Sequence, residues 1–111
     1  MARRDGQGAM QGRVAELGTR FLRRTESELV ALIADIERST DPLDAATLSR
    51  VLALAHRIRG SGGALGFDSI SRQALELMTL ARTAAPGRAA LVSCVARLLR
   101  SIELDPAPTI G

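Results

Sequence analysis

The only histidine of this 111-residue chain, His56, is followed by Arg59 three positions later and by Gly60 four positions later. On a helix these three residues lie on one face, about one turn apart. A solvent-exposed imidazole is mostly neutral near pH 7, so a ring nitrogen can act as a nucleophile without a dedicated base. A guanidinium one turn away can donate charge-assisted hydrogen bonds to a phosphoryl group on that nitrogen. The three residues therefore indicate a site that accepts and holds a phosphoryl group.

The face that carries His56 lies opposite the apolar stripe of its helix, at about 100° per residue. The predicted stripe consists of Val51, Leu54, Ile58, Gly62 and Leu65. The residues expected to surround His56 on the surface and to dock a partner protein are Leu52, Ala53, Gly60 and Gly63. Glycine in a helix interior costs roughly 1 kcal/mol relative to alanine. Packing within the domain does not explain the outward-facing Gly60 and Gly63, whereas close approach by another protein does.

Four helices are predicted from the spacing of the apolar residues. They span about residues 13–38, 44–65, 68–84 and 88–103. Asp44 is a suitable N-cap for the second helix, Gly66 supplies the stop after it, and Asp68 or Ser69 caps the third. Gly18 weakens the first helix and marks a bend or a break in it.

Each of these helices has a single apolar face, so none is stable alone. Connections of a few residues bring consecutive helices together as antiparallel neighbours. We therefore expect an all-α fold, an antiparallel up-down four-helix bundle over residues 13–104. Residues 1–12, with three glycines, are expected to form a flexible tail, and residues 105–111, with two prolines, a C-terminal tail.

The composition fits a single globular helical domain, with 46% hydrophobic and 24% charged residues, no Trp or Tyr, and only Phe21 and Phe67 as aromatics. The formal charge of +3 is too small to imply nucleic-acid binding by itself. Cys94 is alone, which excludes an internal disulfide, and its apolar neighbours predict a buried thiol. We expect a cytoplasmic protein, because no signal peptide and no membrane span is evident.

The residues around His56 resemble the histidine-containing phosphotransfer (HPt) domains of two-component phosphorelays. The shared pattern is His56, Ile58, Arg59, Gly60, the small residues 61–64, and Gly66. Gly66-Phe67 is also similar to the phosphotransfer domains at the N-termini of chemotaxis kinases. The resemblance covers roughly residues 13–103 and is strongest over 55–82.

That resemblance implies that His56 is the phosphoryl acceptor and donor and that Arg59 stabilises the phosphate. It also implies a histidine kinase or a response-regulator receiver domain as partner, and no ATP-dependent kinase activity of the chain itself. No cofactor or metal is expected on the chain, since the receiver holds the Mg²⁺. We expect a monomer with no nucleic-acid or membrane partner, although Leu75 and Leu80 leave a dimer open.

Two positions depart from the family pattern. Arg59 stands where lysine is commoner, which keeps the charge but changes its geometry. Met78 stands twenty-two positions after His56, where the family often has an acidic or amide residue. Gln73 and Arg82 are the candidates for a polar side-chain contact to His56 from the third helix.

Two other functions remain open on the sequence. The bundle could regulate a receiver or kinase by docking without being phosphorylated. Alternatively, the arginine pairs Arg3-Arg4 and Arg23-Arg24 could bind nucleic acid, although the lack of stacking aromatics argues against single-strand binding.

Overall fold

The computed structural model describes residues 2–104, with their side chains from residue 12 onward. It contains four helices, α1 (Ala2–Arg38), α2 (Ala45–Ala64), α3 (Asp68–Ala81) and α4 (Arg88–Leu104). The described residues include no strand, so the all-α class is confirmed. No helix within this part of the chain is long and apolar enough to cross a membrane.

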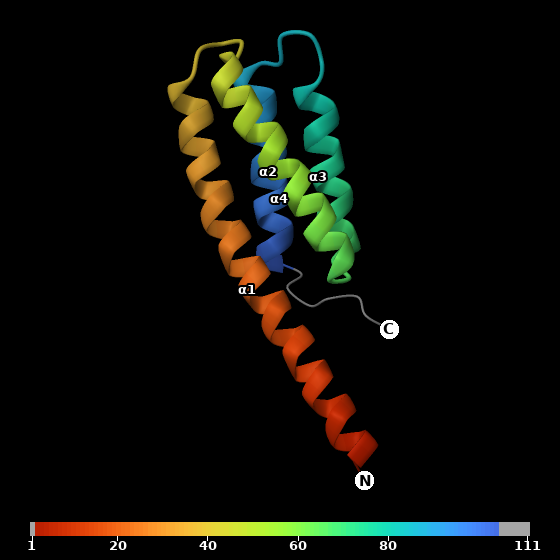
Figure 1. The fold of residues 1–111 in the computed structure, drawn as a ribbon. Coiled ribbons are helices and arrows are strands. Elements are labelled where there is room, and N and C mark those ends of the chain that lie inside the picture. The colour runs from red at the N-terminus through yellow and green to blue at the C-terminus, as the bar shows by residue number, and fades with distance from the viewer. Residues whose placement is uncertain (1, 105–111) are drawn as a thin grey trace.

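The helices pack as a bundle in which successive helices run in opposite directions (Figure 1). Each helix contacts two neighbours, so that α2 lies between α1 and α3, and α4 closes the bundle from the other side. The contact between α2 and α3 is the most extensive, and the contact between α1 and α2 is the least. Because α2 contacts α3 more extensively than α1, its buried face is turned toward α3.

The core is built almost entirely from aliphatic side chains, as the composition predicts. Its largest fully buried members are Leu29, Ile36, Val51, Ile58, Leu77, Leu91, Val95 and Leu98. Each such side chain contributes about 1.5–3 kcal/mol of hydrophobic stabilisation relative to an exposed one. All four helices supply members, so each is held by the others.

The first helix begins at Ala2, well before the predicted start at residue 13. The expected tail over residues 1–12 is therefore helical from residue 2, and this part of α1 projects past the end of the bundle (Figure 1). The physical reason is that glycine weakens a helix by about 1 kcal/mol per residue but still makes the backbone hydrogen bonds. The flexibility of this segment stays a prediction, and the expected C-terminal tail, residues 105–111, lies outside the described residues.

Of the bend or break predicted at Gly18, the break is wrong, because α1 is continuous through it. Gly18 is buried, and a Cβ atom there would lie 3.3 Å from Cζ of Phe67. The Phe67 ring also stacks on Phe21, with the ring centroids 5.6 Å apart. The absence of a side chain at Gly18 thus lets the ring of Phe67, in the turn between α2 and α3, pack directly on α1.

Filling this contact is expected to destabilise the bundle. We predict that Gly18→Leu lowers the free energy of unfolding by roughly 1–3 kcal/mol, because the new side chain overlaps the Phe67 ring. Gly12→Leu is the matched control on the same helix, since nothing lies within 4 Å of a Cβ atom at Gly12. Urea denaturation of both variants checks the prediction, and equal stabilities would contradict it.

The N-terminus of α2 is capped as the sequence predicts. Oδ1 of Asp44 accepts a hydrogen bond from the backbone N–H of Thr47 at 2.7 Å, and the Ser39 hydroxyl donates to Oδ2 at 2.8 Å. These hydrogen bonds, the one from Thr47 first, lower the pKa of Asp44. After α2, Gly66 adopts a positive φ of 86°, which confirms its role as the stop.

The third helix starts at residue 68 as predicted but departs from the prediction in its N-cap and in its end. Its N-cap position is Phe67, with no side-chain cap, instead of Asp68 or Ser69. The backbone N–H of Phe67 donates to the Gly62 carbonyl, and the buried ring holds this residue in place. The tertiary anchoring of Phe67 therefore sets the start of α3. The helix ends at Ala81, three residues earlier than expected.

The cap at Asp44 predicts a pH-dependent difference between wild type and Asp44→Asn. Because the folded-state pKa is lowered, the charged cap stabilises the fold above the ordinary aspartate pKa of about 3.9 and loses this effect as pH falls through the lower folded value. The wild type should therefore be the more stable protein at pH 7, and the difference should shrink towards pH 2. Urea denaturation across this range measures it, with Glu26→Gln, an exposed substitution on α1, as control. A difference that stays constant with pH would show that the charge of Asp44 contributes nothing.

Candidate functional site

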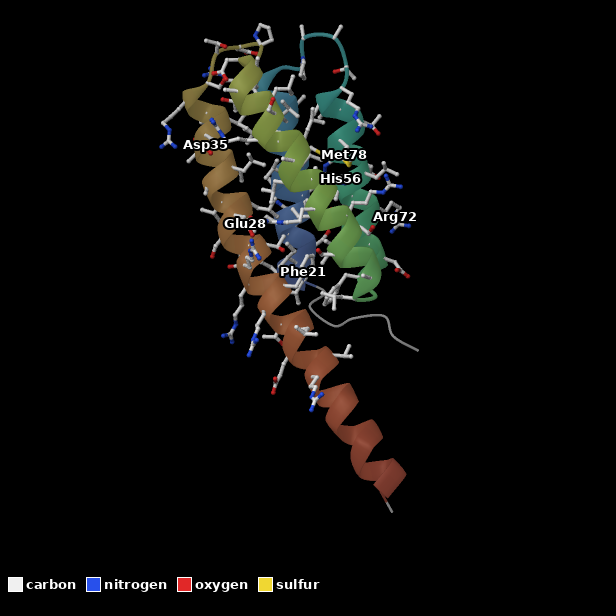
Figure 2. The ribbon with its side chains drawn as sticks, in the orientation of Figure 1. Phe21, Glu28, Asp35, His56, Arg72 and Met78 are labelled. Atoms are coloured by element: carbon white, nitrogen blue, oxygen red, sulfur yellow. The ribbon has the colours of Figure 1, made fainter. Side chains whose placement is uncertain are left out.

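His56 lies near the middle of α2 and its side chain is exposed (Figure 2). Its neighbour Ala55 is fully buried, as is Ile58 two positions on. The imidazole is thus carried by a helix whose other side is fixed in the core, which is the placement that the sequence predicts.

The buried face of α2 is turned further toward α3 than predicted. Its buried residues are Thr47, Val51, Ala55, Ile58 and Gly62, whereas Leu54 and Leu65 are only partly buried. The reason is tertiary: α2 packs more extensively on α3 than on α1. The small side chain of Ala55 fits this closer contact, so the residue beside His56 joins the core.

Arg59 and Gly60 share the exposed face of α2 with His56. The Arg59 guanidinium has no ion-pair or hydrogen-bond partner among the described side chains, so its donors are available to an incoming anion. A Cβ atom at Gly60 would meet nothing within 4 Å. Packing inside the bundle therefore gives no reason for glycine at this position.

Gly62 and Gly63 lie where α2 meets the start of α3. A Cβ atom at Gly62 would be 3.6 Å from the Ser71 backbone nitrogen, and one at Gly63 would be 3.4 Å from Ser71 Oγ. The same hydroxyl donates a hydrogen bond to the Arg59 carbonyl at 2.8 Å. Gly62 is buried in this contact, although a Cβ atom there would make only ordinary van der Waals contacts. Gly63 is exposed but also accommodates Ser71, which the sequence pattern did not indicate.

The other two residues predicted to dock a partner lie one turn before His56. Ala53 is exposed and Leu52 is half-buried. Leu75 on the neighbouring helix α3 is 38% exposed, while Leu80 is partly buried against the core. Exposed or half-buried apolar side chains are therefore present on α2 one turn before the imidazole, and Leu75 adds exposed apolar surface on α3.

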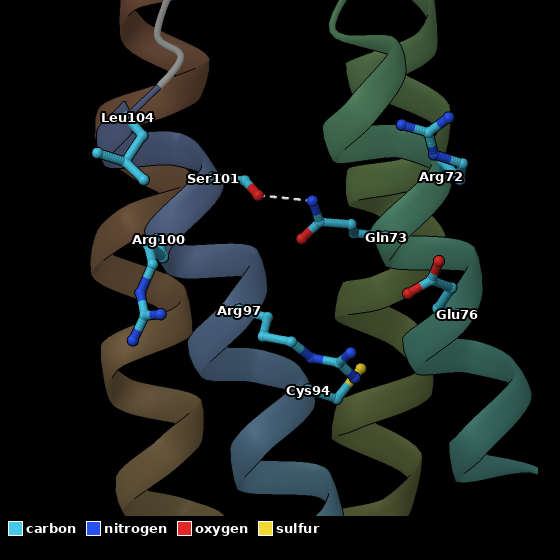
Figure 3. Close-up of a pocket in the computed structure, with 8 residues that line it drawn as sticks. All are labelled: Arg72, Gln73, Glu76, Cys94, Arg97, Arg100, Ser101 and Leu104. Carbon is cyan, nitrogen blue, oxygen red and sulfur yellow. Dashed lines mark hydrogen bonds between the residues drawn. The ribbon is translucent and has the colours of Figure 1, made fainter.

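The predicted polar contact from α3 is not made by Gln73. Its Nε2 donates a 2.5 Å hydrogen bond to Ser101 Oγ on α4, on the side of α3 away from α2 (Figure 3). Met78, by contrast, is buried at about the level of His56 (Figure 2). Arg82 forms the C-cap of α3 through its backbone and is exposed. The sequence could not indicate the direction of Gln73, because polar residues lie on both sides of the core stripe of α3.

A shallow groove of about 390 Å³ lies between α3 and α4, with Glu76, Cys94 and Arg97 among its lining residues (Figure 3). Cys94 is buried as predicted, and burial raises the pKa of its thiol although Arg97 opposes the effect. No residue of α2 lines this groove, so it is separate from the His56 face.

Arg57, next to His56, forms an ion pair with Glu28 of α1, and Glu28 is also bound by Arg24 at 3.0 Å. The sequence pattern did not single out Arg57. Its partner is 29 positions away, so only the packing of α1 on α2 reveals the pair.

Comparison with known proteins adds one finding. A family model described as Hpt domain matches residues 20–104. The match includes all of α2, α3 and α4 and the part of α1 that packs in the bundle. No curated protein and no solved structure is significantly similar to the chain.

Proposed function

Because the chain belongs to the Hpt domain family, we propose that it carries a phosphoryl group on His56 between the proteins of a two-component system. A histidine kinase or a receiver-domain aspartate supplies the group, and a response-regulator aspartate receives it. The chain is a carrier in this scheme and not an ATP-dependent kinase. Any Mg²⁺ is held by the receiver.

One observation carries the proposal: His56 is exposed on α2 and is followed by an unpaired guanidinium at Arg59 and by open space at Gly60. A nucleophile must reach the phosphorus atom of an aspartyl phosphate that lies in another protein. The exposure of His56 and the absence of a side chain at Gly60 therefore favour phosphoryl transfer, whereas a buried imidazole would prevent it.

The transfer step balances without a cofactor on this chain. The unprotonated ring nitrogen of His56 attacks phosphorus, a P–N bond forms, and the P–O bond to the receiver aspartate breaks. The electron pair of that bond returns to the carboxylate, and the proton on the other ring nitrogen can leave to solvent. Arg59 is placed one turn away to neutralise phosphoryl charge, and the reverse step passes the group on.

Incubation with phosphorylated receivers tests this function. Purified receiver domains, phosphorylated with radiolabelled acetyl phosphate, are each mixed with the chain for seconds. The expected result is rapid acid-labile, alkali-stable label on the chain, with mass spectrometry assigning the phosphate to His56. Label on another residue would refute His56 as the acceptor. No label from any receiver while docking is still detected would favour a binding module that is not phosphorylated.

A further inference from the structure

The groove between α3 and α4 carries positive charge that the bundle itself does not neutralise. Its charged lining residues are Arg72, Glu76, Arg97 and Arg100, so three arginines and one glutamate give a net charge of +2. All four side chains are exposed, and none of them takes part in an ion pair among residues 12–104. Arg97 also hydrogen-bonds the Cys94 thiol. A guanidinium has five N–H donors, so each arginine keeps donors for an incoming anion.

The single carboxylate of the groove is too little to balance these arginines. If Glu76 turned to bind one of them, two positive charges would still remain. Arg97 and Arg100 lie three positions apart on α4, about 4.5 Å along the helix axis. Like charges on adjacent turns of a helix repel each other. An anion bound in the groove would relieve this repulsion.

Gln73 supplies a second, uncharged indication of a missing partner. Its Nε2 donates to Ser101 Oγ, whereas its Oε1 is buried and has no hydrogen-bond partner. A buried acceptor without a donor is unfavourable. Figure 3 shows the amide directed across the groove, between Arg72 and Arg97. The last torsion of a glutamine side chain is broad, so the amide can turn Oε1 toward a donor that enters the groove.

The ligand that fits is therefore an anion that also carries hydrogen-bond donors. A peptide with acidic side chains has both, since every residue other than proline adds a backbone N–H. Arg97 lies one turn from Ser101 on α4, about 6 Å along the axis, and side chains two positions apart on an extended peptide are separated by nearly the same distance. The groove is also shallow, whereas sites for small molecules enclose most of their ligand.

We infer that the α3–α4 groove binds an extended acidic segment of a second protein. Carboxylates two positions apart on the segment meet Arg72 and Arg97, and Oε1 of Gln73 accepts a hydrogen bond from a backbone N–H of the segment. No residue of α2 lines the groove. The segment can therefore stay bound while His56 exchanges its phosphoryl group. This binding goes beyond the proposed function and does not depend on it.

A synthetic acidic peptide tests the inference. The probe is a fluorescein-labelled peptide of six glutamates, and its Kd is measured by fluorescence anisotropy in 50 mM salt. We expect saturable binding to the wild-type chain and none of the matching peptide of six glutamines. The double variant Arg72→Gln/Arg97→Gln should raise the Kd at least about tenfold, because two ion pairs with the peptide are lost.

Arg23→Gln/Arg82→Gln is the matched control. Both arginines are exposed and neither lines the groove, so this variant loses the same charge at other places and its Kd should change less than threefold. Thermal unfolding verifies that both double variants are folded. Absence of saturable binding to the wild type, or equal losses in the two variants, overturns the inference. Displacement of the peptide by tripolyphosphate at a lower concentration than by unlabelled peptide would identify a phosphate site instead.

Phosphoryl transfer provides the last measurement. With the groove saturated by the peptide, a phosphorylated receiver should label the chain at a rate within twofold of that without peptide. Slower labelling would place the peptide on the His56 face and overturn the groove assignment. A chain that binds the peptide but is labelled by no receiver would overturn the proposed function and leave this inference standing.

Discussion

Replacing His56 with glutamine is expected to abolish phosphoryl acceptance while the bundle stays folded. The amide of glutamine is not a nucleophile at neutral pH, so no P–N bond can form. Since His56 is exposed, the substitution should change the free energy of unfolding by no more than about 0.5 kcal/mol. The measurement is incorporation of radiolabel from a phosphorylated receiver, together with urea denaturation.

Ser49→Ala provides the control for this experiment. Ser49 is exposed two turns before His56 on the same helix, and its variant should label like the wild type. Acid-labile label that persists on the His56→Gln protein would refute the assignment of the acceptor.

Replacing Gly60 with glutamate is expected to slow transfer at least about a hundredfold, equivalent to roughly 2.7 kcal/mol in the barrier. The new side chain occupies the open space one turn from His56, and its charge repels the phosphoryl group. The fold should not suffer, because a Cβ atom at Gly60 meets nothing within 4 Å. Glycine is also the poorer helix former, so Gly60→Ala should stabilise the protein by about 0.5–1 kcal/mol.

Single-turnover transfer and urea denaturation of these variants separate the two effects. Ala46→Glu is the matched control, with a carboxylate at an exposed position of α2 about 21 Å from Gly60 along the helix. It should transfer at the wild-type rate. Equal rates for Gly60→Glu and wild type would show that the space above Gly60 is not used in docking.

The glycines show where interpretation from the sequence ends. A Cβ atom at Gly60 would meet nothing within 4 Å, in agreement with its predicted place on an open surface, whereas its role in docking stays a prediction. Gly18 was interpreted as a bend or a break, but α1 is continuous there and the glycine accommodates the Phe67 ring, while Gly63 lies against Ser71. A glycine in the sequence shows only that a side chain is absent. Its neighbours from other helices decide whether this absence serves packing, a turn or an incoming partner.

Some helix boundaries also follow from local signals in the sequence, whereas others depend on contacts with another helix. The start of α2 at its Asp44 cap and its stop at Gly66 follow from local hydrogen bonds and backbone preference, and both were predicted correctly. The start of α3 follows from the burial of the Phe67 ring against α1, which no local signal indicates.

The sequence by itself determined that His56, Arg59 and Gly60 share one exposed face of a helix. This relation depends only on the 3.6-residue period and on an apolar stripe within one segment. Only the tertiary structure decided that Ala55 joins the core beside His56, that Gln73 turns to Ser101, and that Arg57 pairs with Glu28. These features depend on how closely separate helices approach one another, and that distance is set by the packing of the whole core.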